Sequence, residues 1–150
     1  MKKVLFFLFT LIVFTSFGKE IKASYEEIRN SISLIEKYIK ENEEDIISIL
    51  SEAIEIEKRA STEYLAQKIK EKICRTSKIK EDEFKNLRKN FSFFDISIAW
   101  AISQTSNIFL EKVLKEKELK TWKELLRENI NQKEKIINKI RELNPKSESF

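Results

Sequence analysis

The most apolar part of the chain after its N-terminus is the stretch from Phe91 to Leu114. No charged residue lies between Asp95 and Glu111. Apolar residues recur there at steps of three and four, which is the spacing of a helix face. They are Phe91, Phe94, Ile98, Ala101, Ile102, Ile108 and Phe109, with Phe93, Ile96 and Trp100 on the opposite side. The pattern therefore predicts a central helix that is buried on every face.

A membrane span is the alternative interpretation of this stretch. A span needs about 20 mainly apolar residues, whereas Asp95, Ser97 and the polar run from Ser103 to Asn107 interrupt this one. The pattern favours a buried helix, and we expect no membrane span in the mature chain. The polar run could line a ligand pocket or a helix contact, although satisfied or solvent-facing groups are the commoner situation.

Two amphipathic helices are predicted before the central stretch. Ser24 and Glu27 have the spacing of a capping box, in which each side chain binds the other residue's backbone amide. The apolar stripe of this first helix runs to about Lys40 and consists of Tyr25, Ile28, Ile32, Ile35 and Ile39. Asn42 is a good cap for a second, long helix that extends to about Arg75. One face of the second helix is marked by Ile46, Leu50, Ala53, Ala60 and Tyr64.

Two further helices and a tail are predicted around the central helix. The polar segment 76–80 is the expected connection to a short third helix over residues 81–88. Thr121 and Glu124 form a second capping box, which begins a final helix. Its stripe consists of Leu119, Trp122, Leu126, Ile130, Ile137 and Ile140. Asn129 and Lys133 fall inside this stripe, where a polar residue can fix the register of a coiled coil or lie where the helix extends past its partner. The second interpretation is favoured, because the repeat is too short for a coiled-coil assignment. Pro145 ends the helix, and we expect residues 145–150 to be a disordered tail.

Composition agrees with an all-α fold class. Gly18 is the only glycine and Pro145 the only proline. Tight hairpin turns between strands depend on glycine and proline, so the chain has almost none of the residues that a β-sheet needs for its turns. We expect a single all-helical domain over residues 19–144. It would be a bundle of about four to five helices around the apolar central helix, compact or elongated.

The N-terminus has the pattern of a secretory signal peptide over residues 1–18. Lys2 and Lys3 form a basic start, an apolar run follows to Phe14, and Ser16 and Gly18 have the spacing of a cleavage site. An uncleaved anchor is the alternative, but the apolar run is shorter than a span requires. We expect an exported protein that lies in the periplasm, at the cell surface or outside the cell.

Charge and missing residue types exclude several functions. Removing Lys2 and Lys3 with the signal lowers the net charge from +4 to +2, and no basic block remains, so we expect no nucleic-acid partner. The absence of histidine excludes histidine-based triads and imidazole metal sites. Phosphate-cradling loops need glycines that the mature chain lacks. We therefore predict no catalytic, cofactor-binding or metal-binding residues and no cofactor.

Three groups of residues remain candidates for a functional site: carboxylate clusters, the single cysteine and six aromatic residues. Carboxylates cluster at Glu41–Asp45, at Glu52, Glu55 and Glu57, and at Glu81–Glu83. Paired carboxylates can hydrolyse glycosides, but these clusters lie among lysines and are expected to be solvated. Cys74, the only cysteine, is expected to be a small buried residue, and the alternative is an intermolecular bridge. Six aromatic residues are expected in the core, namely Phe91, Phe93, Phe94, Trp100, Phe109 and Trp122; exposed ones would form a binding surface.

The final helix resembles a known family of exported proteins. Leu126, Gln132, Ile136, Ile137 and Ile140, in the segment LLRENINQKEKIINKIREL, are similar to the C-terminal part of the FadA-type small exported helical adhesins. The resemblance covers about the last fifth of the chain and consists of amphipathic helix. It implies adhesion at the cell surface and carries over no site residues. The chain departs from that family in its few alanines and its apolar central helix.

These observations favour an exported, non-enzymatic, helical interaction protein of the bacterial envelope or surface, similar to an adhesin. Its partner would be a protein in the envelope or on a host surface, and a homo-oligomer is an open alternative. A periplasmic holdase chaperone is a second hypothesis, since small exported helical proteins also include such chaperones. The third is a small hydrolase of cell-wall polymers that uses carboxylates alone.

Overall fold

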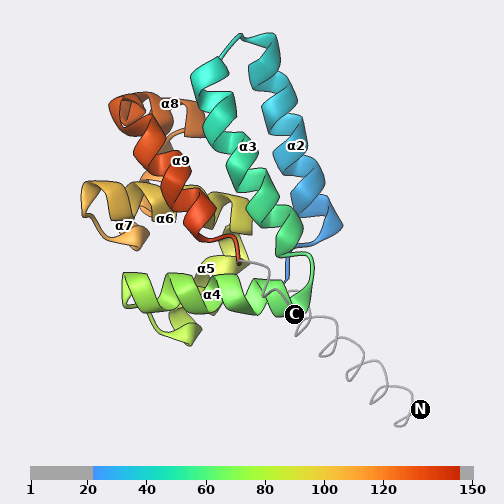
Figure 1. Ribbon diagram of the computed structural model, residues 1–150, viewed down its shortest axis with the longest axis vertical. Coiled ribbons are helices and arrows are strands. Elements are labelled where there is room, and N and C mark those ends of the chain that lie inside the picture. The colour runs from blue at the N-terminus through green and yellow to red at the C-terminus, as the bar shows by residue number, and fades with distance from the viewer. Residues whose placement is uncertain (1–21, 146–150) are drawn as a thin grey trace.

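The computed structural model describes residues 22–145, and this part of the chain is all-α (Figure 1). It contains eight α-helices and one short 3-10 helix: α2 (Tyr25–Lys40), α3 (Glu44–Arg59), α4 (Glu63–Ser77), α5 (Glu81–Asn90), α6 (Phe93–Ser106), α7 (Leu110–Leu119), α8 (Trp122–Glu128), η1 (Ile130–Gln132) and α9 (Lys133–Glu142). The predicted fold class is confirmed. The predicted signal peptide, residues 1–18, and all of the predicted tail except Pro145 lie outside the described residues.

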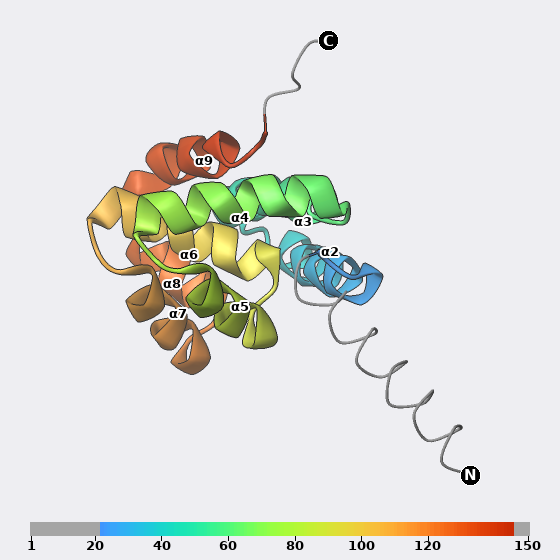
Figure 2. The same ribbon diagram turned by 90° about the horizontal axis from the view of Figure 1, so that it is seen from below.

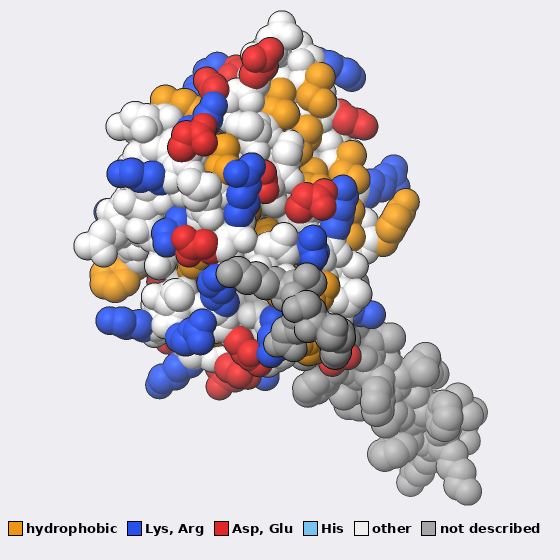
Figure 3. Space-filling view, in the orientation of Figure 1, with side chains coloured by type: hydrophobic (Ala, Val, Ile, Leu, Met, Phe, Trp, Pro, Cys, Tyr) orange, Lys and Arg blue, Asp and Glu red, His pale blue; other side chains and the backbone are white. Residues whose placement is uncertain are grey.

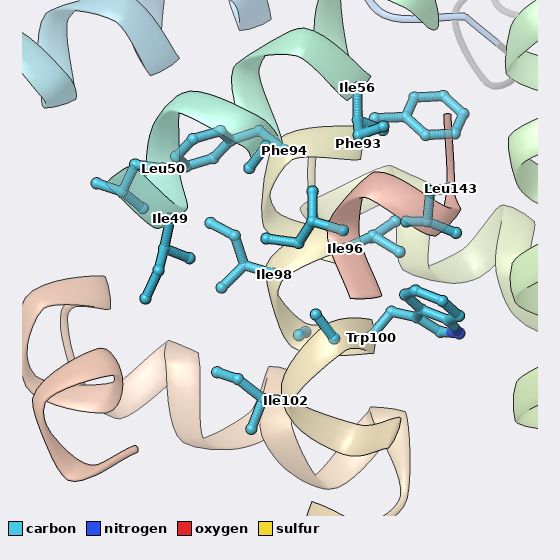
Figure 4. Packing of buried hydrophobic residues seen from close by; sticks show 14 of the residues in the cluster. Ile49, Leu50, Ile56, Phe93, Phe94, Ile96, Ile98, Trp100, Ile102 and Leu143 are labelled. Carbon is cyan, nitrogen blue, oxygen red and sulfur yellow. The ribbon is translucent and has the colours of Figure 1, made fainter. Parts of the chain in front are cut away.

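The central helix α6 is buried on all sides, as the apolar pattern predicts. Every residue from Ile96 to Ser103 is buried, and α3, α7 and α9 pack around it. Figure 4 shows Ile96, Ile98 and Trp100 among side chains from neighbouring helices. Within the described residues, no helix combines the length and apolar character needed to cross a membrane.

The central helix is shorter than the predicted stretch 91–114. It begins after Ser92, whose capping box with Asp95 binds the first free amides. It ends at Asn107, which has a left-handed conformation with φ of 54°, and asparagine tolerates that region better than most residues. In the polar run before it, the Ser103 and Thr105 hydroxyls donate to backbone carbonyls one turn earlier.

Two other predicted long helices are also interrupted, so the prediction of four to five helices was too low. The second helix stops after Arg59 and resumes at Glu63 as α4, which crosses the foot of the bundle. At this break the carbonyl of Ala60 accepts a hydrogen bond of 2.8 Å from the amide of Ala23. The final helix breaks at Asn129, whose side chain donates to the Leu125 carbonyl at 2.8 Å.

These interruptions change which side chains face the core. Tyr64 is 61% exposed because the break at Ala60 separates it from the face of α3. Leu119 is 88% exposed at the end of α7 and does not join the stripe of the final helix. Phe109 is 80% exposed, since it precedes α7 as a cap rather than continuing the central helix. The predicted core positions of these three residues are therefore wrong.

The helix caps were predicted with mixed success. Both capping boxes, Ser24 with Glu27 and Thr121 with Glu124, are present. Asn42 does not cap α3, because it takes a left-handed conformation with φ of 55° in the turn after α2. Glu43 occupies the cap position instead and makes no capping hydrogen bond with its side chain.

The first two helices form a hairpin at the edge of the molecule. Figures 1 and 2 show α2 beside α3, and α3 is the helix against which α2 packs most extensively. The opposite flank of α3 contacts α6 and α9 in the core. Helix α2 is therefore an outer layer of the fold, with one flank against α3 and another directed away from the bundle.

Candidate functional site

The clearest candidate for a binding surface is the apolar stripe along α2, which we call the α2 stripe. It consists of Tyr25, Ile28, Ile32, Ile35 and Ile39. The exposed fractions of Tyr25, Ile32 and Ile39 are 83%, 39% and 54%, and Ile28 and Ile35 are half-buried. Hydrophobic side chains follow α2 along the edge of the molecule (Figure 3). Contiguous apolar surface of this kind marks a site of interaction with another molecule.

The α2 stripe is exposed because α2 packs against α3 through an adjoining face. Ser31 and Tyr38 on that face are buried, and Leu34 packs against the core. These residues also recur at steps of three and four, so α2 presents two neighbouring faces, one to the fold and one to solvent. The face turned to the fold includes a serine, whereas three residues of the apolar stripe, Tyr25, Ile32 and Ile39, are exposed to solvent.

A buried arginine fixes the first turn of α2 to the start of α6. Arg88, whose side chain is 1% exposed, donates to both carboxylate oxygens of Glu27 at 2.8 and 3.2 Å and to the carbonyl of Phe91 at 2.7 Å. Its guanidinium lies 4.5 Å from the centre of the Phe93 ring, which is close enough for a cation–π contact. This arrangement holds α2 in place without using the α2 stripe.

The pKa of Glu27 reflects this contact. Burial acts to raise the pKa of the carboxyl group, but the hydrogen bonds from Arg88 and from Ser24 outweigh burial, and the pKa lies below its ordinary value. Glu27 is therefore ionised over the neutral range and forms a charged pair with Arg88. The pair is structural, because Glu27 and both terminal nitrogens of Arg88 form their hydrogen bonds within the fold, although Arg88 Nε has no partner among the described residues.

Glu57 is a second buried charge, which the sequence analysis placed wrongly among the solvated carboxylates. The residue is fully buried, and its Oε2 accepts a hydrogen bond from the amide of Phe94 at the start of α6. Its Oε1 has no hydrogen-bond partner among the described residues. Burial raises the pKa of Glu57 to about 7, with a smaller opposing effect from the Phe94 amide. The contact with the Phe94 amide therefore makes the Glu57 carboxyl group a cap for the first turn of α6.

One signal in the sequence could have identified Glu57 as buried. Ile46, Leu50, Ala53 and Ala60 mark the buried face of α3, and Glu57 fills the step between Ala53 and Ala60. Spacing of this kind places a residue on the same face whatever its polarity. Arg88 carries a weaker signal of the same type, because it lies one turn after the buried Phe84 in α5.

An open pocket of about 320 Å³ lies where α2, α5 and the start of α6 meet. Its polar lining includes Glu27, Arg88, Ser92 and Asp95. These groups are already paired: Asp95 accepts from the Trp122 indole at 2.7 Å and from the Ser92 hydroxyl at 2.9 Å. The pocket therefore offers a ligand little unpaired charge, and we assign it no chemistry.

The predicted carboxylate clusters lie on the surface, apart from Glu57, and several of them form ion pairs between helices. Glu41 and Glu43 pair with Lys123, Asp45 with Lys133, and Glu52 with Arg141. The hydrogen bond from Lys123 lowers the pKa of Glu41. These pairs join the α2–α3 hairpin to α8 and α9. Among the described residues, no group of three or more acidic or thiol side chains could hold a metal ion.

The remaining candidates are single residues. Cys74 in α4 is half-buried and packs against the core, and burial raises the pKa of its thiol. Of the six aromatic residues predicted in the core, Phe93, Phe94, Trp100 and Trp122 are buried and Phe91 is half-buried, whereas Phe109 is exposed. The isolated exposure of Phe109 does not make a continuous apolar surface like the α2 stripe.

Comparison with protein-family models, with curated proteins and with solved structures finds no match to this chain. The resemblance of the final helix to the FadA-type adhesins is accordingly untested and stays a prediction.

Proposed function

We propose that the protein is an exported, non-enzymatic interaction protein of the bacterial envelope or surface, similar to an adhesin, and that it binds a protein partner through the α2 stripe. One observation carries this proposal: five apolar residues follow one another along four turns of a helix, and three of them are exposed. Export rests on the N-terminal pattern of residues 1–18.

The form of the α2 stripe indicates the type of partner. Its residues have the alternating steps of three and four that an amphipathic helix uses to enter a complementary groove or to pair with another helix. At about 1.5 Å per residue, the helix presents a ridge roughly 24 Å long. A straight apolar ridge of that length fits the side of another helix better than it fits a small molecule.

Site-specific photo-crosslinking in cells that produce the protein tests this function. A photoreactive amino acid replaces Ile32 or Ile39 in the α2 stripe, and Leu119 serves as the control because it is 88% exposed and lies on α7. We expect covalent protein adducts from the two positions in the stripe and none from position 119. Absence of adducts from the stripe, or equal adducts from all three positions, would contradict the proposal.

The same apolar ridge could also bind unfolded chains, as a periplasmic holdase chaperone does. A holdase suppresses the aggregation of an unfolded outer-membrane protein, and Ile39→Glu would then abolish the suppression while Leu119→Glu would preserve it. We favour the adhesin-like function because the ridge is narrow and regular, whereas promiscuous binding surfaces are adaptable.

A further inference from the structure

Beside the α2 stripe, a basic residue lies on one side of the stripe's midpoint and an acidic residue lies on the other side. Tyr25 and Ile39 are equally distant along the chain from Ile32, which is the midpoint of the stripe. Arg29 lies one turn before this midpoint and Glu36 one turn after it, on the flank of the stripe that faces solvent. Neither residue forms an ion pair within residues 22–145, where the structure describes the chain.

The two ends of α2 also carry opposite charges, in the reverse order. Glu26 lies in the first turn and Lys40 in the last, so the helix is acidic at its start and basic at its end. Reversing the direction of the helix exchanges the two signs. An identical helix that runs antiparallel therefore places Arg29 of one copy beside Glu36 of the other, and it brings the basic end of each copy to the acidic start of the other.

We propose that the partner of the α2 stripe is a second copy of this chain, with the two α2 helices antiparallel about a two-fold axis near Ile32. In this arrangement Arg29 of each copy faces Glu36 of the other, and the two apolar stripes bury one another. Charged residues that flank an apolar seam select the partner and the orientation of paired helices. An isologous contact of this kind is closed and gives a dimer.

The arrangement is compatible with the fold because α3 occupies a different flank of α2. The buried face of α2, with Ser31 and Tyr38, adjoins the α2 stripe and is directed toward α3. The other flank carries Arg29 and Glu36 and is exposed. A second α2 can thus approach along the stripe at the edge of the molecule, where Figure 3 shows the hydrophobic side chains.

This inference rests on the proposed function, because it names the occupant of the same stripe. The test uses the mature chain, residues 19–150, in a reducing buffer that prevents a bridge through Cys74. Sedimentation equilibrium measures its mass at protein concentrations from about 1 to 500 μM. This wide range is needed because one helix pair buries less than roughly 1,200 Å² of surface, and interfaces of that size are weak. We expect a doubling of mass with rising concentration.

Charge reversal tests the antiparallel geometry. Arg29→Glu alone places two like-charged pairs in the interface, and so does Glu36→Arg alone; each should weaken dimerisation about tenfold. The double variant R29E/E36R restores opposite charges at both pairs and should dimerise like the wild type. A mixture of the two single variants should form a heterodimer more readily than either variant forms a homodimer, because both of its cross-chain pairs are then complementary.

Two matched variants separate the α2 stripe from general surface effects. Ile32→Glu should abolish the dimer, because residue 32 of one chain meets residue 32 of the other near the two-fold axis. Leu119→Glu should leave the dimer unchanged. A wild-type chain that stays monomeric at all concentrations would overturn the inference, and so would a dimer that charge reversal and mixing do not affect. The proposed function survives that result if photo-crosslinking at Ile32 joins the stripe to a different protein, and it fails if no adduct forms.

Discussion

Helices α6 and α2 both have apolar residues at steps of three and four, but α6 is apolar on every side whereas α2 has a single apolar stripe, and the two helices lie in different parts of the fold. Both begin with a capping box. In α6 every residue from Ile96 to Ser103 is buried, whereas in α2 only Ser31 and Tyr38 are buried, and three of the five residues of the apolar stripe are exposed. Periodicity identifies a helix and its apolar face, but it does not state which neighbour covers that face.

Apolar side chains in this chain have two roles: those of α6 stabilise the monomer, and those exposed on α2 can bind a partner. The side chains of α6 stabilise the monomer, because α3, α7 and α9 remove them from water. The α2 stripe contributes less to the monomer, since α2 is held by its contact with α3 and by the Arg88–Glu27 pair. The residues of the stripe that the monomer leaves exposed, Tyr25, Ile32 and Ile39, are available for a partner.

The largest expected effect comes from placing a charge in α6. Ile98→Asp buries a carboxylate where the native side chain is 0% exposed, and the cost of burying an unpaired charge exceeds the stability of a typical domain. Far-UV circular dichroism should show loss of helix. Ile39→Asp, the matched change in the α2 stripe, should retain the wild-type spectrum. A folded Ile98→Asp protein would contradict the assignment of α6 to the core.

Glu57 at the α3–α6 contact should make stability depend on pH. Its pKa of about 7 in the folded chain lies above the ordinary value of 4.5, so the folded state binds this proton more tightly than the unfolded state. The resulting stabilisation is complete below pH 4.5 and is lost as pH rises through 7. The free energy of unfolding should fall by about 3 kcal/mol across this interval.

Urea unfolding at pH 5 and at pH 8 measures this contribution. Glu57→Gln keeps an oxygen that accepts from the Phe94 amide but cannot ionise, so it should remove about 3 kcal/mol of the pH difference. Glu41, whose pKa is lowered rather than raised, provides the control: Glu41→Gln should keep the wild-type difference. Identical pH differences in the wild type and in Glu57→Gln would show that Glu57 does not titrate in this interval.

A smaller loss is expected where α2 is joined to α6. Arg88→Met keeps most of the side-chain length but leaves the Glu27 carboxylate without its charged partner. Glu27 is 27% exposed, so water partly replaces the lost contact, and we expect a destabilisation of about 2 kcal/mol. Arg141→Met, which breaks a surface pair with Glu52, should cost less than about 1 kcal/mol. Equal losses in the two variants would mean that Arg88 does not anchor α2.

The smallest effect is expected in the α2 stripe itself. Ile39→Ala should change the free energy of unfolding of the monomer by about 0.5 kcal/mol or less, because the side chain is 54% exposed. Ile98→Ala, the matched truncation in α6, should cost roughly 2 to 5 kcal/mol. Urea denaturation at low protein concentration provides both values. A cost of several kcal/mol for Ile39→Ala would show that the monomer depends on the stripe.

The sequence predicted those parts of the fold that depend on neighbouring residues in the chain. The capping boxes at Ser24 and Thr121 are local, and the burial of α6 follows from a run without charges. The breaks at Ala60, Asn107 and Asn129 were not predicted. They lack the glycine or proline that normally marks a break, and the first of them depends on a contact with the distant Ala23.

The candidate site was predicted only in part, for the same reason. The five residues of the α2 stripe were identified by their spacing, but their exposure depends on where α3 lies. The Arg88–Glu27 pair joins residues 61 positions apart, and no local pattern predicts it. Glu57 was assigned to the surface by its charge, although its position between Ala53 and Ala60 placed it on the buried face.

Amide hydrogen exchange at two protein concentrations tests the central claim most directly, because it reads α2 and α6 in the same sample. Amides in α6 should be strongly protected at both concentrations, since they exchange only when the core opens. Amides in α2 should exchange faster at about 1 μM than at about 500 μM, where the second copy covers the stripe. Protection of α2 that equals that of α6 and does not change with concentration would contradict the account.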